Sequence, residues 1–182
     1  ETPARLHTKA RSIGIDIDNL VASGALEIVW QPPSENLPDE LAQRLLAAVE
    51  NRAVKRVFFD GISALRHAFL FPERMPLFIN AINNTLRGSD TTIIYSMELP
   101  QLFMPDHITT DEMSSMVENV VLTHYVRQAE RIEREILILK IRDSDFDAFP
   151  EVFHITDRGV CFGRSHTREK RPDAGEDARG GA

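Results

Sequence analysis

A carboxylate at the end of a short apolar strand is the first feature that could do chemistry. Residues 56–59 (Arg-Val-Phe-Phe) have the side chains of a buried strand, and Asp60 follows them directly. In open α/β sheets, ligands bind beyond the carboxyl ends of the strands, and an aspartate there can hold Mg²⁺ directly or through water. The alternative is an ordinary strand that ends in an Asp-Gly turn. The segment by itself leaves both interpretations open.

Two cations near the end of a later strand are the second such feature. Lys140 and Arg142 are two residues apart, so their side chains lie on the same face of an extended strand. Such a pair can bind the phosphates of a nucleotide, and in a ring-shaped oligomer it can reach the site of the neighbouring subunit. The same charges would also protect a solvated edge strand from aggregation. Position alone does not decide between the two.

The apolar pattern predicts the elements that position these side chains. Helical spacing predicts helices from Pro3 to near Gly14 and over 16–23, 40–51 and 76–86. Short apolar runs predict buried strands at 26–30, 57–59, 91–95 and 119–126. Residues 133–142 and 151–162 alternate apolar and polar side chains around a turn, which predicts a C-terminal antiparallel hairpin. Strands separated by helices imply a mainly parallel sheet, so the predicted class is α/β with helices flanking the sheet.

Aromatic side chains and the segments outside these elements complete the organisation. Trp30, Phe58, Phe59 and Phe78 lie within predicted elements and are expected in the core. The long connection 98–116 is expected to be a functional loop. We expect one domain over residues 1–163 and a disordered charged tail over 164–182, because the tail has no aliphatic or aromatic anchor.

Composition restricts the class of partner. The chain has 182 residues, 42% of them hydrophobic, and 21 basic against 28 acidic residues give a net charge of −7. This charge works against a phosphate-backbone footprint, so nucleic acid is not an expected partner. Cys161 is the only cysteine, and no apolar run approaches the ~20 residues that span a bilayer. We therefore expect a cytoplasmic domain without a membrane partner.

Five segments occur in an order that resembles a known family. They are residues 1–6 (ETPARL), 59–65 (FDGISAL), 120–126 (VVLTHYV), 140–142 (KIR) and 155–159 (ITDRG). In order and rough spacing they resemble the KaiC-like circadian clock ATPases of the RecA superfamily. The resemblance covers nearly everything from Glu1 to Phe162, and it implies a RecA-like fold that binds ATP and Mg²⁺.

The resemblance also implies roles for particular residues. Asp60 matches the Walker B aspartate that holds Mg²⁺ with ATP, and Glu1 matches the second of two glutamates with a general-base role. Lys140 and Arg142 resemble cations that reach the γ-phosphate across a subunit interface, and residues 155–159 resemble the stretch near the adenine. Asp143 stands where many relatives have glycine.

Two further expectations concern phosphate chemistry. No G-x-x-x-x-G-K-[ST] pattern occurs in these 182 residues, so the chain is expected to be an N-terminally truncated P-loop NTPase core that is nearly inactive by itself. Ser114 and Ser115 stand where clock members of the family carry an autophosphorylated Ser-Thr pair. Their hydroxyls are candidate phosphoacceptors; alternatively, they cap the element that begins at Met116.

Two functions follow from this reading. In the first, the parent protein is an ATPase that hydrolyses ATP between subunits of a homo-oligomeric ring, with Ser/Thr autokinase activity as an extension. In the second, the chain is a noncatalytic signalling or oligomerisation module on a RecA-like scaffold, with a signalling protein as its partner. The missing phosphate loop and the acidic Asp143 support the second.

Overall fold

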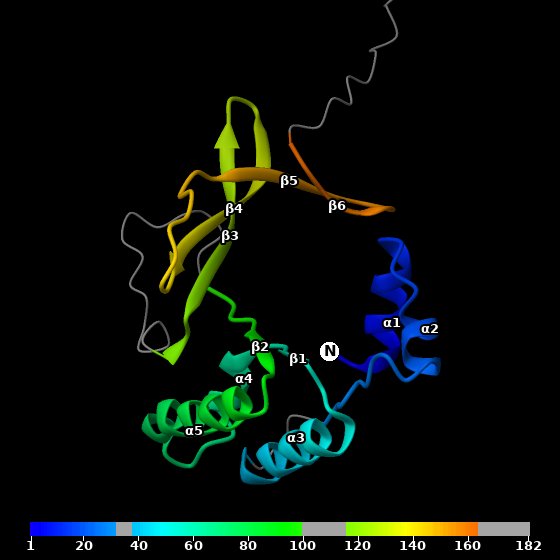
Figure 1. The fold of residues 1–182 in the computed structure, drawn as a ribbon. Coiled ribbons are helices and arrows are strands. Elements are labelled where there is room, and N and C mark those ends of the chain that lie inside the picture. Colours follow the sequence, from blue (N-terminus) through cyan, green and yellow to red (C-terminus); the bar gives the residue numbers. More distant parts are fainter. Residues whose placement is uncertain (32–37, 100–115, 164–182) are drawn as a thin grey trace, which may run out of the picture.

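The computed structural model describes residues 1–31, 38–99 and 116–163, and its elements fall into separate groups (Figure 1). Helices α1 (Pro3–Ser12) and α2 (Ile17–Ala22) pack together near the N-terminus. A parallel pair of strands with its helices forms a second group, and an antiparallel sheet of four strands forms a third. The α/β class predicted from the sequence is confirmed. Within the described residues, no helix is both long and apolar enough to cross a membrane.

The N-terminal helices begin and end as the sequence predicts, and charged side chains join them. Pro3 occupies the first turn of α1, where its missing N–H costs nothing. The Asp16 carboxylate caps α2 by accepting a hydrogen bond from the Asn19 N–H at 3.1 Å. Asp18 of α2 binds His7 of α1 at 2.6 Å and also pairs with Arg11. The hydrogen bond from His7, reinforced by Arg11, lowers the pKa of the Asp18 carboxyl below its ordinary value of 3.8.

This lowered pKa predicts an acid-dependent stability difference. An aspartate whose folded pKa is depressed stabilises the fold above its unfolded pKa, near 3.8, and that contribution is lost as the pH falls through the folded value. Asp18→Asn is therefore expected to lower the melting temperature near neutral pH but not at about pH 2, where the wild-type carboxylate is also being protonated. Thermal unfolding followed by circular dichroism measures both. An equal difference at the two pH values would show that charge is not involved.

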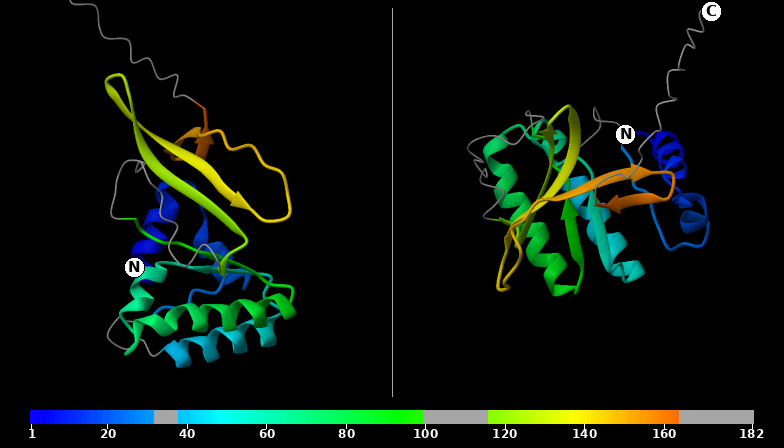
Figure 2. Two further views of the ribbon diagram at one scale, coloured as in Figure 1. Left: turned by 90° about the vertical axis from the view of Figure 1, so that its left-hand side faces the viewer. Right: turned by 90° about the horizontal axis from the view of Figure 1, so that it is seen from above.

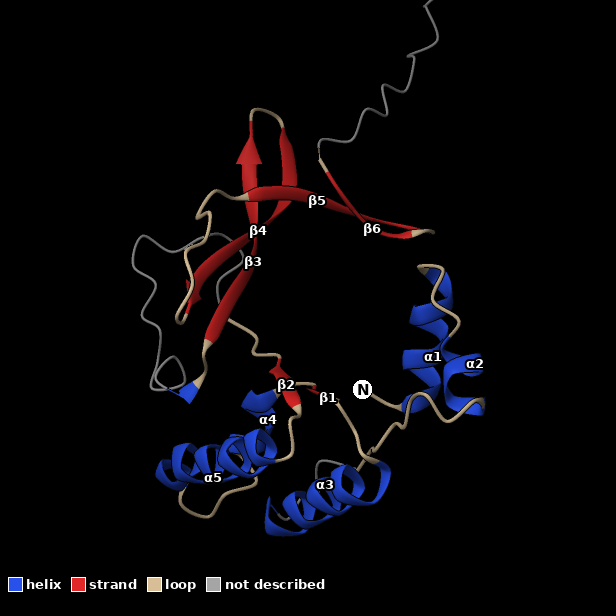
Figure 3. Ribbon diagram, in the orientation of Figure 1, coloured by secondary structure: helices blue, strands red, loops and turns tan. Residues whose placement is uncertain are grey.

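The second group places its helices on one side of the parallel strands, as Figure 3 shows. Strand β1 (Arg56–Phe59) pairs in parallel with β2 (Thr92–Tyr95), from Arg56 opposite Thr92 to Phe59 opposite Tyr95. The helical elements are α3 (Pro38–Arg52), α4 (Ile62–Arg66), the short 3₁₀ helix η2 (Pro72–Arg74) and α5 (Met75–Gly88). The helices predicted over 40–51 and 76–86 and the strands predicted at 57–59 and 91–95 are confirmed, whereas α4 and η2 were not predicted.

The core lies between these helices and one face of the strand pair. Ile62, Ile79 and Leu86 are almost completely buried, and Phe59 and Phe78 pack against the same clusters, as predicted. Successive side chains of a strand point to opposite faces. The face of β1 and β2 that meets the helices is therefore the one with Val57, Phe59, Ile93 and Tyr95.

Two aromatic residues expected in the core are exposed. Phe58 is 65% exposed because strand alternation places it on the face of β1 away from the helices. Trp30 is 42% exposed, and the strand predicted at residues 26–30 does not form. A strand needs a neighbour for its backbone hydrogen bonds, and among the described strands none pairs with this segment. Instead, Leu26 donates its N–H to Leu20, and Glu27 pairs with Arg52.

The antiparallel sheet is larger than the sequence predicts. Its order is β3 (Asn119–Gln128), β4 (Arg131–Ile141), β5 (Glu151–Thr156) and β6 (Gly159–Phe162). The strand predicted at 119–126 was expected in the parallel sheet, but it pairs antiparallel with β4, with Asn119 opposite Ile141. The segment 151–162 is two strands and not one, because the chain reverses at Asp157 and Arg158 and Gly159 adopts a φ of 101°. Parallel pairing in the described residues is confined to β1 and β2.

Candidate functional site

The carboxyl ends of β1 and β2 bring two polar side chains together. Asp60 follows β1 and Ser96 follows β2, and the parallel register places them side by side. The Ser96 hydroxyl donates to Asp60 Oδ1 at 2.8 Å, and the Gly61 N–H donates to Ser96 Oγ at 2.7 Å. Backbone hydrogen bonds continue the connection. The Ser96 N–H donates to the Phe59 carbonyl, and the Ile62 N–H donates to the Ser96 carbonyl. Asp60 is thus held at the edge where ligands bind in α/β sheets.

This arrangement suits a metal ion that is bound partly by the protein and partly by the phosphates of a substrate. Asp60 is exposed, and an ionised carboxylate has about four lone-pair sites, so the bond from Ser96 leaves capacity for Mg²⁺. No group of three or more His, Cys, Asp or Glu side chains in the described parts of the chain could hold a metal ion by itself. Mg²⁺ commonly binds through one or two carboxylates and completes its shell with waters and substrate phosphates. The residues present at Asp60 fit such a site.

Ser96 was missed from the sequence. A lone serine after an apolar strand resembles any loop residue, and its importance comes from the adjacent strand. The signal in the sequence was its position. Ser96 directly follows the strand predicted at 91–95, just as Asp60 directly follows the strand predicted at 57–59. Two strands that end in register place their following residues next to each other.

A buried polar network supports the same end of β2. The Tyr95 hydroxyl donates to Asn83 Oδ1 at 2.7 Å, and Asn83 Nδ2 donates to the Met116 carbonyl at 3.1 Å. Burial raises the pKa of Tyr95 to about 12, so the hydroxyl keeps its proton at neutral pH. The network links β2 and α5 to Met116, three residues before β3, and so supports the backbone beside Ser96.

Lys140 and Arg142 lie at the C-terminal end of β4, which pairs with the start of β3. Lys140 is half-buried, and its Nζ donates to the Val117 carbonyl at 2.9 Å. Strand β4 ends at Ile141, so Arg142 is the first residue beyond it; its N–H donates to the Glu118 carbonyl at 3.1 Å, and its side chain is exposed. The two cations therefore lie beside the segment that enters β3.

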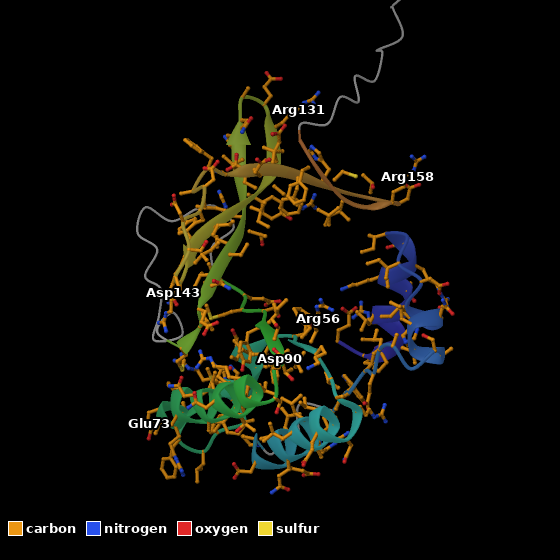
Figure 4. The ribbon with its side chains drawn as sticks, viewed as in Figure 1. Arg56, Glu73, Asp90, Arg131, Asp143 and Arg158 are labelled. Atoms are coloured by element: carbon orange, nitrogen blue, oxygen red, sulfur yellow. The ribbon has the colours of Figure 1, made fainter. Side chains whose placement is uncertain are left out.

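The backbone explains why position 143 suits glycine. Asp143 has a φ of 63°, in the left-handed region that glycine adopts without strain and that aspartate tolerates better than most residues. The turn geometry thus accounts for an Asp at this position without any contact to a ligand. Figure 4 shows Asp143 and Arg158 at opposite sides of the antiparallel sheet, so the turn after β4 and the β5–β6 turn are far apart.

The remaining candidates lie on other elements. Glu1 precedes α1, and its Oε2 pairs with Lys9 Nζ at 3.0 Å. The segment 155–159 forms the β5–β6 turn, where the Thr156 hydroxyl donates to the Gly159 carbonyl at 3.0 Å. Ser114, Ser115 and the tail 164–182 lie outside the described residues. Glu1, Asp60 and Lys140 each bind a different partner, namely Lys9, Ser96 and Val117.

Comparison with known proteins identifies the family of the chain. A family model described as "ATPase: KaiC" matches residues 1–166. The circadian clock oscillator protein KaiC of Thermostichus vulcanus is 26% identical over 161 residues, which cover 88% of this chain and 31% of that protein. KaiC of Synechococcus elongatus is 25% identical over 160 residues (87% and 30%), and the clock protein KaiC3 of Synechocystis is 24% identical over 165 residues (90% and 32%). The chain spans about a third of these relatives, and it belongs to the KaiC ATPase family.

Proposed function

We propose that the protein containing this chain binds and hydrolyses ATP between subunits of a homo-oligomer. The carrying observation is the Asp60–Ser96 pair at the carboxyl ends of two parallel strands, in a chain of the KaiC ATPase family. Asp60 holds Mg²⁺, and Ser96 orients the carboxylate by donating to Oδ1 at 2.8 Å. When bound, Mg²⁺ neutralises charge that develops on the transferred phosphoryl group.

Glu1, Lys140 and Arg142 complete the proposed machinery. Glu1 orients and deprotonates the attacking water as a general base. Lys140 and Arg142 bind the γ-phosphate of ATP held by the neighbouring subunit. Support for these roles comes from the family, whose model matches residues 1–166. ATP hydrolysis also requires a phosphate-binding loop, which these 182 residues do not contain.

Arg142 gives a direct test of action between subunits. Arg142→Ala in the full-length protein is expected to lower ATP turnover by about 100-fold or more, as for other arginines that stabilise the transferred phosphoryl group. Mixing Arg142→Ala subunits with Asp60→Asn subunits should restore part of the activity, because some interfaces then combine both intact halves. Release of phosphate measures both effects.

The matched control is Arg131→Ala, an exposed arginine at the opposite end of β4. It should leave turnover within about twofold of the wild type. Equal turnover in the Arg142 and Arg131 variants would remove Arg142 from the mechanism. Loss of turnover without recovery on mixing would place Arg142 in the site of its own subunit.

The finer assignments and the second function are also proposals. Autophosphorylation of Ser114 or Ser115 would extend the ATPase to an autokinase, and the family supports a cytoplasmic clock or signalling context. The alternative is a noncatalytic module that binds a signalling partner. A fluorescent ATP analogue titrated while the mass in solution is followed separates the two, since oligomers that form without nucleotide and without analogue binding favour the module.

A further inference from the structure

The end of α1 contacts the β5–β6 turn through backbone atoms. Gly14 follows α1 with a φ of 76°, and a Cβ placed on it would lie 2.5 Å from the Asp157 carbonyl oxygen and 3.5 Å from Arg158 Cα. On the other side of the contact, a Cβ on Gly159 would lie 3.9 Å from the Ile13 carbonyl oxygen. Figure 2 also shows α1 and α2 beside this turn. Two segments far apart in the sequence thus approach without intervening side chains.

Glycine is required at position 14 for two independent reasons. Its φ of 76° is strained for a residue with a Cβ, and its contact distance excludes one. The neighbouring atoms belong to backbone and not to a flexible side chain, so they can yield only if the turn or the helix moves. Gly24 provides the contrast, because its φ is 74° and a Cβ there would have nothing within 4 Å.

The present inference rests on the proposed function of Glu1 and on the resemblance of residues 155–159 to the stretch that lies near the adenine. Residues 155–159 form the β5–β6 turn. Glu1 lies two residues before the start of α1, and its pairing with Lys9 at 3.0 Å holds it against the helix. An α-helix is a stiff element, so a displacement of its C-terminal end also moves its N-terminal end.

We propose that Gly14 is a positioning residue that couples recognition of the nucleotide base at the β5–β6 turn to the placement of Glu1. Close backbone packing at Gly14 sets the distance between the turn and α1. A base seated at the turn therefore fixes the helix, and the helix fixes the carboxylate that activates water. Gly14 contacts neither the nucleotide nor the reacting atoms.

The test compares Gly14→Ala with Gly24→Ala in the full-length protein. Both substitutions strain a left-handed backbone, but only the first inserts a methyl group into a backbone contact. Gly14→Ala is expected to lower kcat by about 100-fold, which is typical of a small misplacement at a catalytic group, and to reduce the preference for ATP over GTP by about tenfold. Gly24→Ala should keep both values within about twofold of the wild type.

A readout that does not need activity follows the contact itself. Hydrogen exchange of the amides in β5 and β6 should become faster in Gly14→Ala and remain unchanged in Gly24→Ala. If Gly14→Ala does not fold, Gly14→Asn replaces it with Gly24→Asn as control, because asparagine tolerates the left-handed region while keeping the Cβ.

The outcomes separate the inference from the function on which it rests. A wild-type protein without ATP turnover would overturn the proposed function and the coupling with it. A wild-type protein that hydrolyses ATP, with Gly14 and Gly24 variants of equal kcat and equal base preference, would overturn the coupling alone. Reduced kcat with unchanged base preference would also overturn it, because Gly14 would then support Glu1 without linking it to the base.

Discussion

Asp60→Asn is expected to lower Mg²⁺-dependent ATP turnover of the full-length protein by about 100-fold or more. The substitution keeps the size of the side chain and its bond from Ser96, but it removes the negative charge that holds the metal ion. Binding of an ATP analogue without Mg²⁺ should change little, because the loss concerns the metal. Steady-state release of phosphate over a range of Mg²⁺ concentrations measures the effect.

Asp90→Asn is the matched control for this prediction. Asp90 precedes β2 at the amino ends of the same two strands, where it pairs with Lys55 at 3.1 Å, and Figure 4 shows it on this group. Its removal should leave turnover within about twofold of the wild type. Ser96→Ala should have an intermediate effect, about tenfold, because the carboxylate keeps its charge and loses its orientation. Wild-type turnover in Asp60→Asn would exclude Asp60 from the mechanism.

Ile79→Ala is expected to lower the free energy of unfolding by about 3 kcal/mol. Ile79 of α5 is completely buried in the cluster that also contains Ile62, Leu65 and Met75. Truncating the side chain removes buried apolar surface and leaves a cavity between α5 and α4. Helix α4 begins at Ile62, directly after Asp60 and Gly61. Urea or guanidinium unfolding, followed by circular dichroism, measures the change.

Leu77→Ala provides the comparison on the same helix. Leu77 is 70% exposed, so its truncation should change the free energy of unfolding by no more than about 0.5 kcal/mol. A similar loss for both variants would mean that position 77 is covered in the protein under study. A negligible loss for Ile79→Ala would contradict the core assignment.

Local patterns determined much of the fold. Apolar spacing and Pro3 located the first helix, a second was predicted over 16–23, and apolar spacing also located α3 and α5. These signals are readable because a helix satisfies its hydrogen bonds within one segment. The short strands with Phe59 and Tyr95 were also located, and Asp60 was recognised because a carboxylate directly follows an apolar strand.

Strand pairing was not readable in the same way. The run at 26–30 has the composition of a strand but no partner in the described chain, and the strand predicted at 119–126 pairs with β4 and not with a parallel neighbour. Phe58 has the composition of a core residue and lies on the face away from the helices. A strand bonds to residues elsewhere in the sequence, so composition does not identify its partner or its buried face.

By itself, the sequence determined that Asp60 ends a strand, that Lys140 and Arg142 stand two residues apart near the end of another, and that the family is KaiC-like. Only the tertiary structure placed Ser96 against Asp60, the Val117 carbonyl on Lys140 and Gly14 against Asp157. It also showed that Asp143 occupies a left-handed position. The physical reason is the same for each: residue types follow from the chain, whereas contacts between distant segments depend on how the strands pair and the helices pack.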